Sequence, residues 1–336
     1  MVSARPLCLL LGLACALGAA CTDFEDPQVV IDMRILAMRA DPPEILVPYD
    51  PAEPTRVDLA DLAPIQVCVL VADPTEQRGL TWSMSLCPPT GSGRCRGNVP
   101  IFDLGGGTVG DPETSEEPVS MCAVVEPNAD LLTVLAEALS ADDLAGFGGI
   151  SAQVTAQLGP EGRGGAGDDD TLFGFKRLRY SPELPADRVA NTNPTVNRFV
   201  GARRPTGERG LDFDIPIGRC GEIEPFTVAP GERVALLPDE PAGVREEYAV
   251  PTFDGGERHF TENLTYQWHS TEGKWSPFES GGTIDVAGNE PPLDSTWTAP
   301  DDAELIGDGL DVRIWIVQRD ERGGQTWYES CARVVP

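Results

Sequence analysis

Strict alternation of apolar and polar residues is the pattern that most limits the folds open to this chain. In ISAQVTAQL, the apolar positions 150, 152, 154, 156 and 158 alternate with Ser, Gln and Thr. Successive side chains of a strand point to opposite faces, so this pattern predicts a half-buried β-strand. The stretch PIQVCVLVADP likewise places Ile65, Val67, Val69 and Val71 on one face. Short alternating runs broken by 36 Gly and 31 Pro predict an all-β fold.

One helix is predicted, after Asn128 as N-cap. A single stripe at helical spacing carries Leu131, Val134, Leu135, Ala138 and Leu139. Such a stripe favours packing over a sheet rather than binding a partner.

The two halves of the chain have related patterns. The second contains LDVRIWIVQRDERGGQTWYESCARVV and the first ISAQVTAQLGPEGRGGAGDDDTLFGFKRLRY, each with a strand, a turn containing Arg-Gly-Gly and another strand. Paired glycines suit hairpin turns because they accept positive φ. At about 150 residues per domain, the 336 residues predict two domains. We place the boundary near Asn191, so that residues 30–190 and 191–336 form the two units.

The N-terminus has the layout of a secretory signal over residues 1–20: Arg5, an apolar run from Leu7 to Leu17, and then small residues. The apolar run is too short to span a bilayer. Cys21 directly after Ala20 resembles the lipobox of bacterial lipoproteins, although Gly18 stands where that family prefers Leu. The resemblance implies cleavage before Cys21 and a lipid on its thiol, with residues 21–29 as lipidated N-terminus and linker. An ordinary signal peptide is the alternative, and Cys15 is a second, weaker lipidation candidate.

Six further cysteines predict disulfides, because an exported chain meets an oxidising compartment. Four lie in the first half and allow three pairings. We favour three bonds: Cys87–Cys95 around the turn PPTGSGR, Cys68–Cys122, and Cys220–Cys331. Zinc is the rival, but there is no CxxC and the histidines are His259 and His269. We therefore expect no metal and no cofactor.

The second half resembles bacterial immunoglobulin-like or PKD-like β-sandwich domains. The resemblance lies in VAPGERVAL, LTYQW, TWTAP and VRIWIVQRDERGG, in that order. It implies that Trp268 lies between two sheets, with Leu264 and Tyr266 on the same face. The first half has looser equivalents and carries the helix and long loops as insertions. The whole chain resembles uncharacterised bacterial lipoproteins built of two tandem Ig-like β-sandwich domains.

Two possible binding features stand out. GAGDDDTLF places Asp168, Asp169 and Asp170 in a glycine-rich loop, where three consecutive aspartates suit a solvated turn better than a calcium site. With Val312, Ile314 and Ile316 facing inward, Trp315 and Arg313 face outward, a composition typical of an interaction surface. The alternative, which we favour because exposed apolar patches on monomers are small, is that the first domain or a loop covers Trp315.

Catalytic chemistry finds little support. The chain has no GxSxG, HExxH, P-loop or well-placed GxGxxG, and the alternation predicts that His269 is a surface residue. A formal net charge of −29 disfavours nucleic acid as a partner.

We therefore expect a lipid-anchored cell-envelope protein, at the outer membrane because Thr22 rather than Asp follows the cysteine. It would act as a non-catalytic scaffold or recognition module for protein or polysaccharide. The alternative is a secreted or anchored enzyme of polymer processing.

Overall fold

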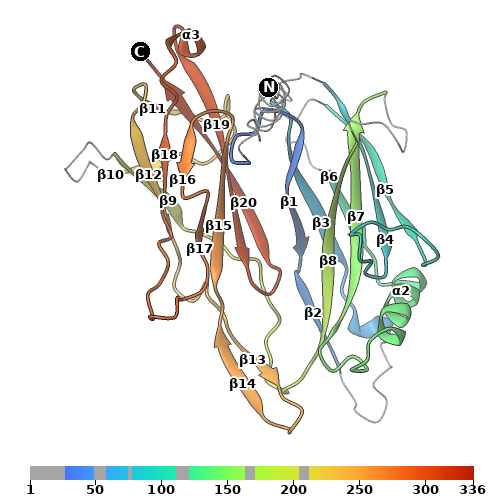
Figure 1. Cartoon of the computed structure of the whole chain (residues 1–336). Coiled ribbons are helices and arrows are strands. Elements are labelled where there is room, and N and C mark those ends of the chain that lie inside the picture. The colour runs from blue at the N-terminus through green and yellow to red at the C-terminus, as the bar shows by residue number, and fades with distance from the viewer. Residues whose placement is uncertain (1–26, 49–57, 75–77, 111–120, 163–170, 204–211) are drawn as a thin grey trace, which may run out of the picture.

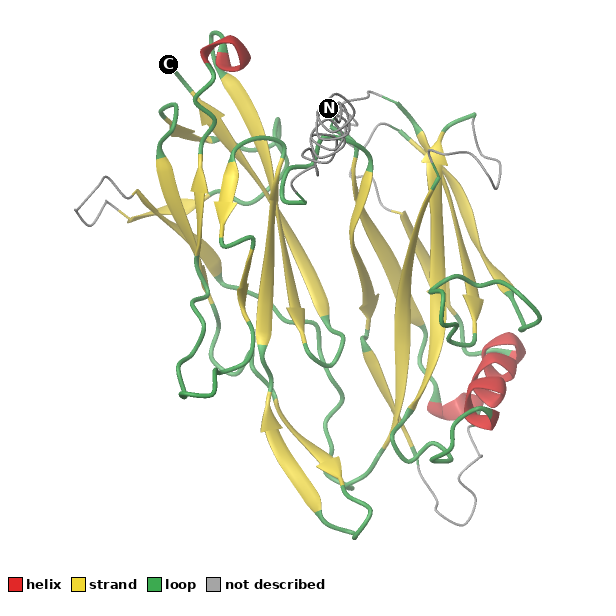
Figure 2. Ribbon diagram, in the orientation of Figure 1, coloured by secondary structure: helices red, strands yellow, loops and turns green. Residues whose placement is uncertain are grey.

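The computed structural model describes residues 27–48, 58–74, 78–110, 121–162, 171–203 and 212–336. Within these ranges the regular secondary structure is mostly β-strand, arranged as two β-sandwiches that lie side by side (Figures 1 and 2). The predicted all-β class and its two tandem Ig-like sandwiches are confirmed. The last strand of the first sandwich ends at Pro182 and the next begins at Arg198, so the boundary near Asn191 falls between them.

The first sandwich contains two sheets of orders β1-β3-β6 and β2-β8-β7-β4-β5. The strand β2 runs parallel to β8, and every other neighbouring pair is antiparallel. The elements are β1 (Arg34–Asp41), β2 (Glu44–Val47), the 3-10 helix η1 (Leu59–Asp61), β3 (Ile65–Ala72), β4 (Leu80–Cys87), β5 (Phe102–Val109), β6 (Met121–Val125), the helix α2 (Ala129–Ser140), β7 (Ile150–Pro160) and β8 (Leu172–Pro182).

The helix α2 begins as the sequence predicts. The side-chain oxygen of Asn128 accepts hydrogen bonds from the backbone N of Asp130 and of Leu131, both at 3.0 Å. Its apolar stripe is buried at Leu131, Val134, Leu135 and Leu139 within the core of the first sandwich. The helix, which follows β6 and precedes β7 in the chain, therefore packs against β7 and β4 and leaves its polar face exposed.

The second sandwich contains sheets of orders β10-β9-β12-β18-β16 and β11-β20-β19-β15-β17, with β13 and β14 as a separate hairpin. Here β11 runs parallel to the last strand, β20, as β2 does to β8. The elements are β9 (Arg198–Arg203), β10 (Asp212–Ile215), β11 (Phe226–Val228), β12 (Arg233–Asp239), β13 (Glu247–Pro251), β14 (Glu257–Thr261), β15 (Leu264–Ser270), β16 (Lys274–Ser276), β17 (Glu279–Gly281), β18 (Ser295–Thr298), the helix α3 (Ala303–Ile306), β19 (Leu310–Asp320) and β20 (Gln325–Val334).

Trp268 occupies the core of the second sandwich, as predicted. It is fully buried between the sheets, and Leu264 and Tyr266 are buried on the same face of β15. Its ring stacks on that of Trp275 with centroids 5.3 Å apart, and its Nε1 donates to the hydroxyl of Ser280 at 2.9 Å. A buried tryptophan needs such an acceptor, so Ser280 is part of the reason this position tolerates Trp.

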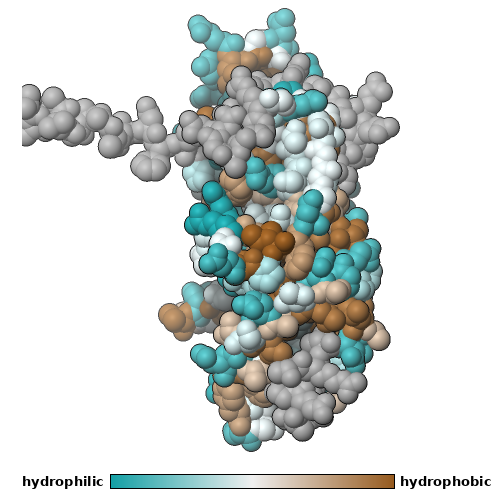
Figure 3. All heavy atoms as spheres, turned by 90° about the vertical axis from the view of Figure 1, so that its right-hand side faces the viewer, coloured by the Kyte–Doolittle hydropathy of each residue, from teal (hydrophilic) through white to brown (hydrophobic). Residues whose placement is uncertain are grey.

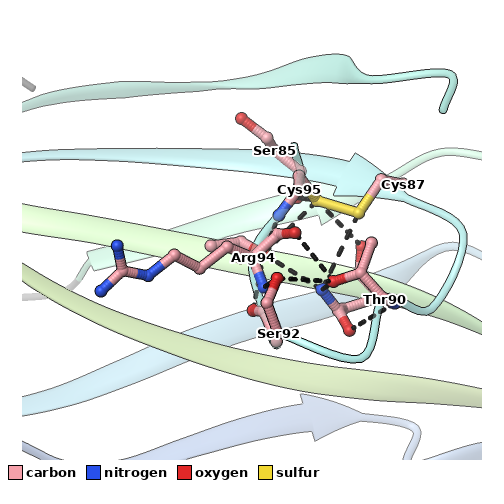
Figure 4. Close-up of a disulfide and its surroundings, with 9 residues drawn as sticks. Ser85, Cys87, Thr90, Ser92, Arg94 and Cys95 are labelled. Atoms are coloured by element: carbon pink, nitrogen blue, oxygen red, sulfur yellow. Dashed lines mark hydrogen bonds between the residues drawn. A yellow bond between two sulfur atoms is a disulfide. The ribbon is translucent and has the colours of Figure 1, made fainter. Parts of the chain in front are cut away.

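The three predicted disulfides are present. Cys68–Cys122 joins β3 to β6, and Cys220–Cys331 ties the loop before β11 to β20. Cys87–Cys95 closes the turn after β4, where the Thr90 hydroxyl donates to the carbonyl of Arg94 at 2.8 Å (Figure 4). In the first half the bonds are nested, because Cys87 and Cys95 lie between Cys68 and Cys122 in the sequence.

The outer faces of two sheets, one from each sandwich, pack against each other. Trp315 and Val317 of β19 lie in one buried cluster with residues of the first sandwich, and Trp327 of β20 packs at its margin. The members from residues 30–72 are Val30, Leu36, Ala37, Leu70 and Ala72. Strands β3 and β19 therefore bury both faces, one in their own core and one at this joint.

A β-bulge in β1 supplies part of the joint. The register of β1 on β3 shifts between Ile35 and Ala37, which leaves Leu36 as an extra residue. Because a bulge re-aims side chains, Leu36 and its neighbour Ala37 both reach the joint, whereas Met38 and Ala40 face the first core.

Two sequence predictions are corrected here. Trp315 is only 2% exposed and Arg313 is half-buried, so neither forms an exposed binding surface. The first sandwich covers Trp315, as the favoured alternative predicts. His269 is 7% exposed rather than a surface residue. It is paired across the sheet with Trp315, its ring lies edge-on to Phe278 at 5.3 Å, and burial lowers its pKa to about 4.

The N-terminal segment adds to this cover. The backbone N of Val30 donates to the carbonyl of Ser270 at 2.9 Å, and the N of Ser270 donates to the carbonyl of Gln28 at 3.0 Å. Residues 28–30 thus pair with the end of β15 in the second sandwich before the chain enters β1 of the first.

We predict that the disulfides differ in their contribution to stability. Cys220 and Cys331 are 111 residues apart in the sequence, whereas Cys87 and Cys95 are 8 apart. Removing Cys220–Cys331 (C220S with C331S) therefore opens a much longer loop in the unfolded chain. In the chain-entropy model the costs are about 5 and about 2.5 kcal/mol. Urea unfolding of both double variants measures the difference, and equal or reversed losses would contradict this reasoning.

We predict that Trp315→Ala destabilises the chain by about 3–5 kcal/mol, because it empties a site enclosed by both sandwiches. Phe175→Ala is the matched control, since Phe175 is 51% exposed and should lose less than about 1 kcal/mol. Denaturant unfolding of the two variants gives the comparison. A Trp315→Ala loss as small as that of the control would mean that the joint is not packed as described.

Candidate functional site

A groove of about 510 Å³ lies where the two sandwiches meet. One wall comes from β1 and β8 of the first sandwich and the other from the end of β19, the following turn and the start of β20. The lining residues are Ile35, Leu36, Ala37, Met38, Phe173, Gly174, Phe175, Lys176, Arg177, Arg319, Asp320, Gly323, Gly324 and Gln325. A volume of this size is typical of a ligand site.

The groove runs along strand edges. Five consecutive residues of β8 and four of β1 line it. Because successive side chains point to opposite faces of a sheet, consecutive residues share one groove only where it follows the edge of the strand.

Side chains from outside the first sandwich already occupy the β1 edge. Arg319 Nη2 donates to the carbonyl of Leu36 at 3.2 Å, and the side-chain amide of Asn193 donates to the carbonyl of Ala40 at 2.8 Å. Between them, the side-chain amide of Gln325 lies against the backbone of Met38. These contacts satisfy alternate backbone groups of an edge strand and close it to further pairing.

The β8 edge is open over part of its length. The strand β2 pairs with β8 only at Arg179–Pro182, which leaves residues 172–178 without a hydrogen-bonded strand on that side. The side chains of Ile35 and Met38 in β1 lie against Gly174 in this stretch. Among the described residues, no side chain hydrogen-bonds to the backbone of this stretch. The groove therefore contains one closed and one open strand edge.

Three cations line the groove: Lys176, Arg177 and Arg319. Within the described part of the chain, none of them has a carboxylate within ion-pair distance. Lys176 Nζ instead donates to the carbonyl of Gly323 at 2.6 Å, and burial lowers its pKa to about 8, so it is still mostly charged near pH 7. In a chain with a net charge of −29, this groove is a local concentration of unpaired positive charge.

The one acidic side chain of the lining is occupied. Asp320 accepts hydrogen bonds from the backbone N of Arg322 at 2.8 Å and of Gly324 at 2.7 Å, and from the side-chain amide of Asn191 at 3.1 Å. These donors hold the carboxylate of Asp320 in the turn. Asp320 therefore stabilises the turn and does not fully neutralise the positive charge of the groove.

Two phenylalanines add apolar surface to β8. The guanidinium of Arg94 lies 3.8 Å from the ring centroid of Phe173, while Phe175 is half exposed. By contrast, the side of the first sandwich that faces away from the joint shows hydrophobic groups separated by hydrophilic ones (Figure 3). The groove is therefore the stronger candidate for binding.

A buried ion cluster fixes one end of the joint. Arg322 Nη2 donates to Glu44 at 2.6 Å, and its Nη1 donates to Glu246 at 3.2 Å and Glu262 at 3.3 Å. Glu44 belongs to β2 of the first sandwich, so one arginine links both sandwiches. Arg188, in the connecting segment, also donates to Glu44 at 2.8 Å.

The protonation of Glu44 follows from its partners. Burial by itself raises its pKa, but hydrogen bonds from the Ser181 hydroxyl and the Asn191 backbone, with the charges of Arg188 and Arg322, outweigh burial and lower the pKa. A buried carboxylate is tolerated when it is paired and hydrogen-bonded in this way.

The turn that carries Arg322 depends on its two glycines for different reasons. Gly323 has a φ of 102°, the left-handed region that glycine accepts easily. Gly324 lies so close to its neighbours that a Cβ would overlap the carboxylate of Asp320 and meet the carbonyl of Thr192 at 2.8 Å. The Arg-Gly-Gly pattern in the second half of the sequence thus places the arginine of the ion cluster.

The remaining sequence candidates are placed as follows. Cys21, Asp168, Asp169, Asp170 and the first Arg-Gly-Gly at residues 163–165 lie outside the described residues. Within the described ranges, no group of three or more His, Cys, Asp or Glu could hold a metal ion. No helix there is long and apolar enough to cross a membrane.

The residues that build the groove were not candidates in the sequence. Lys176 and Arg177 lie in FGFKRLRY, where an apolar-and-basic alternation marks a strand but gives no sign of which edge is free.

Comparisons with known proteins identify no family. No protein-family model matches the chain, and no curated protein matches it. Among solved structures, the chain is similar to E. coli alpha-2-macroglobulin in its native conformation, with a TM-score of 0.22 and 11% sequence identity. The match covers 92% of this chain and spans 16% of the length of that protein. A match at this level carries no argument about function.

We predict that Glu262 makes the joint more stable at acidic pH. Burial, with the nearby charges of Asp320 and Glu246, raises the pKa of Glu262 to about 7, although Arg322 opposes this. The folded state then binds more protons than the unfolded state between about pH 4.5 and 7, so this group's stabilisation is lost as the pH rises through that window.

Glu262→Gln removes this titration. Relative to wild type, the variant should gain up to about 3 kcal/mol of unfolding free energy between pH 5 and pH 8. Glu290→Gln, at an exposed position, is the matched control and should show no such trend. Urea unfolding across this pH range provides the test, and parallel curves for wild type and Glu262→Gln would refute the assignment.

Proposed function

We propose that this protein is a lipid-anchored, non-catalytic recognition module of the cell envelope, which binds its partner in the groove between the two sandwiches. The observation that carries the proposal is the groove itself, with an open strand edge and three cations that form no ion pair with the described residues. The groove lies beside the contact between the two sandwiches. The apolar cluster around Trp315 and the ion pair between Glu44 and Arg322 hold this contact together.

The fixed joint supports recognition rather than flexible spacing. Binding costs less free energy when the groups that contact a ligand are already held in place. Here both walls of the groove belong to elements that contact each other directly, through Arg319 with Leu36 and Lys176 with Gly323. A ligand would therefore meet a preformed site.

The anchor is supported by the sequence at Cys21 and by the placement of Gln28. Residues 22–28, TDFEDPQ, connect the candidate lipid site to a segment that is hydrogen-bonded to β15. Seven residues span at most about 25 Å. A lipid on Cys21 would thus hold the second sandwich close to the membrane, which we take to be the outer membrane, at its periplasmic or surface face.

We predict that Cys21→Ala abolishes lipidation. The native protein extracted from membranes should begin at Cys21 and be heavier than its polypeptide by a diacylglycerol and acyl groups, as measured by intact mass. Cys15→Ala is the control and should keep the added mass. An unmodified native protein, or a lipid lost only in Cys15→Ala, would overturn the anchor at Cys21.

A further inference from the structure

We propose that the groove binds an extended acidic peptide segment, which pairs as an additional strand with the open edge of β8. This inference rests on the proposed function, because it names the ligand class of the same groove.

The open edge favours a peptide over other ligands. An unpaired strand presents a row of backbone N–H and C=O groups at the spacing of another strand, and an extended peptide satisfies them in order. The stretch 172–178 is long enough for such pairing, and β2 already shows the geometry by pairing with the continuation of the same edge at Arg179–Pro182. A peptide in the groove would extend the line of β2 along β8.

The cations favour acidic side chains on both faces of that added strand. Lys176 and Arg177 are neighbours, so their side chains leave β8 on opposite faces. Arg319 belongs to the second sandwich and reaches across the groove to the edge of β1 in the first. Two consecutive acidic residues in the ligand would therefore reach Arg177 on one face and Lys176, with Arg319, on the other.

Phe175 defines a third position. It lies on the same face of β8 as Arg177 and is half exposed. A ligand residue two positions from the acid that meets Arg177 would lie opposite Phe175, where a β-branched apolar side chain packs well. The ligand pattern is thus apolar-acidic-acidic within an extended segment.

Outside the groove, the net charge of −29 repels an acidic ligand. Specificity for this site then comes from charge as well as from backbone pairing, and binding should weaken as salt increases.

The probe is the capped, fluorescently labelled heptapeptide Thr-Thr-Val-Glu-Glu-Thr-Thr. Its matched forms are one with Lys in place of both Glu residues, and one with alternate backbone nitrogens methylated on the edge that faces β8. Fluorescence anisotropy measures binding to the full mature chain and to two variants. Arg177→Glu reverses a groove charge, and Arg258→Glu reverses an exposed charge on β14 as the control.

The acidic peptide should bind wild type and Arg258→Glu equally, and Arg177→Glu at least about tenfold more weakly. The Lys form and the N-methylated form should each lose at least about tenfold. Equal binding of the N-methylated form would overturn strand addition, and no binding of the acidic peptide would overturn the peptide ligand. If an oligogalacturonate instead binds wild type and is lost in Arg177→Glu, the peptide inference fails while the recognition function stands.

Discussion

The packing of the outer face of β19 on the outer faces of β1 and β3 is the interaction on which the rest of this structure depends. A strand at the surface of a sandwich ordinarily has one apolar and one polar face. Here β19 places Val312, Ile314 and Ile316 in its own core and Trp315 and Val317 in the joint. The second buried face has no use in an isolated domain, because it would expose a large apolar patch to water. The two sandwiches are therefore built to be together.

The polar features of the molecule follow from that packing. Once the two sheets meet, the edge of β1 lies against the second sandwich, and Arg319, Gln325 and Asn193 satisfy its backbone. The same approach buries Glu44 beside Arg322, an arrangement that would be costly for either residue alone. The groove is the space that remains where β8 diverges from this contact. Its open edge remains because β2 pairs with β8 only at Arg179–Pro182.

The sequence predicts individual strands and cores well and the joint poorly, for a physical reason. Alternation shows which residues share a face, so Trp268 between the sheets could be expected, as could the helix cap at Asn128 and the three disulfides. Alternation does not show what covers the opposite face. It therefore left Trp315 open between an exposed binding surface and the favoured cover by the first domain or a loop, and it wrongly placed His269 at the surface. The bulge at Leu36 is equally hidden, since nothing in ILAM distinguishes an extra residue from a regular one. Free edges are a property of the whole sheet, so Lys176 and Arg177 could not be recognised as groove residues in advance.

The central claim is that the two sandwiches form one rigid body, and residual dipolar couplings of the backbone amides in the mature chain test it most directly. Couplings measured from residues of the first sandwich and of the second are fitted separately to an alignment tensor. A rigid joint predicts the same magnitude and orientation for both tensors in the frame of this structure. Tensors that differ in magnitude would show that the sandwiches move independently, and would contradict both the joint and the preformed groove.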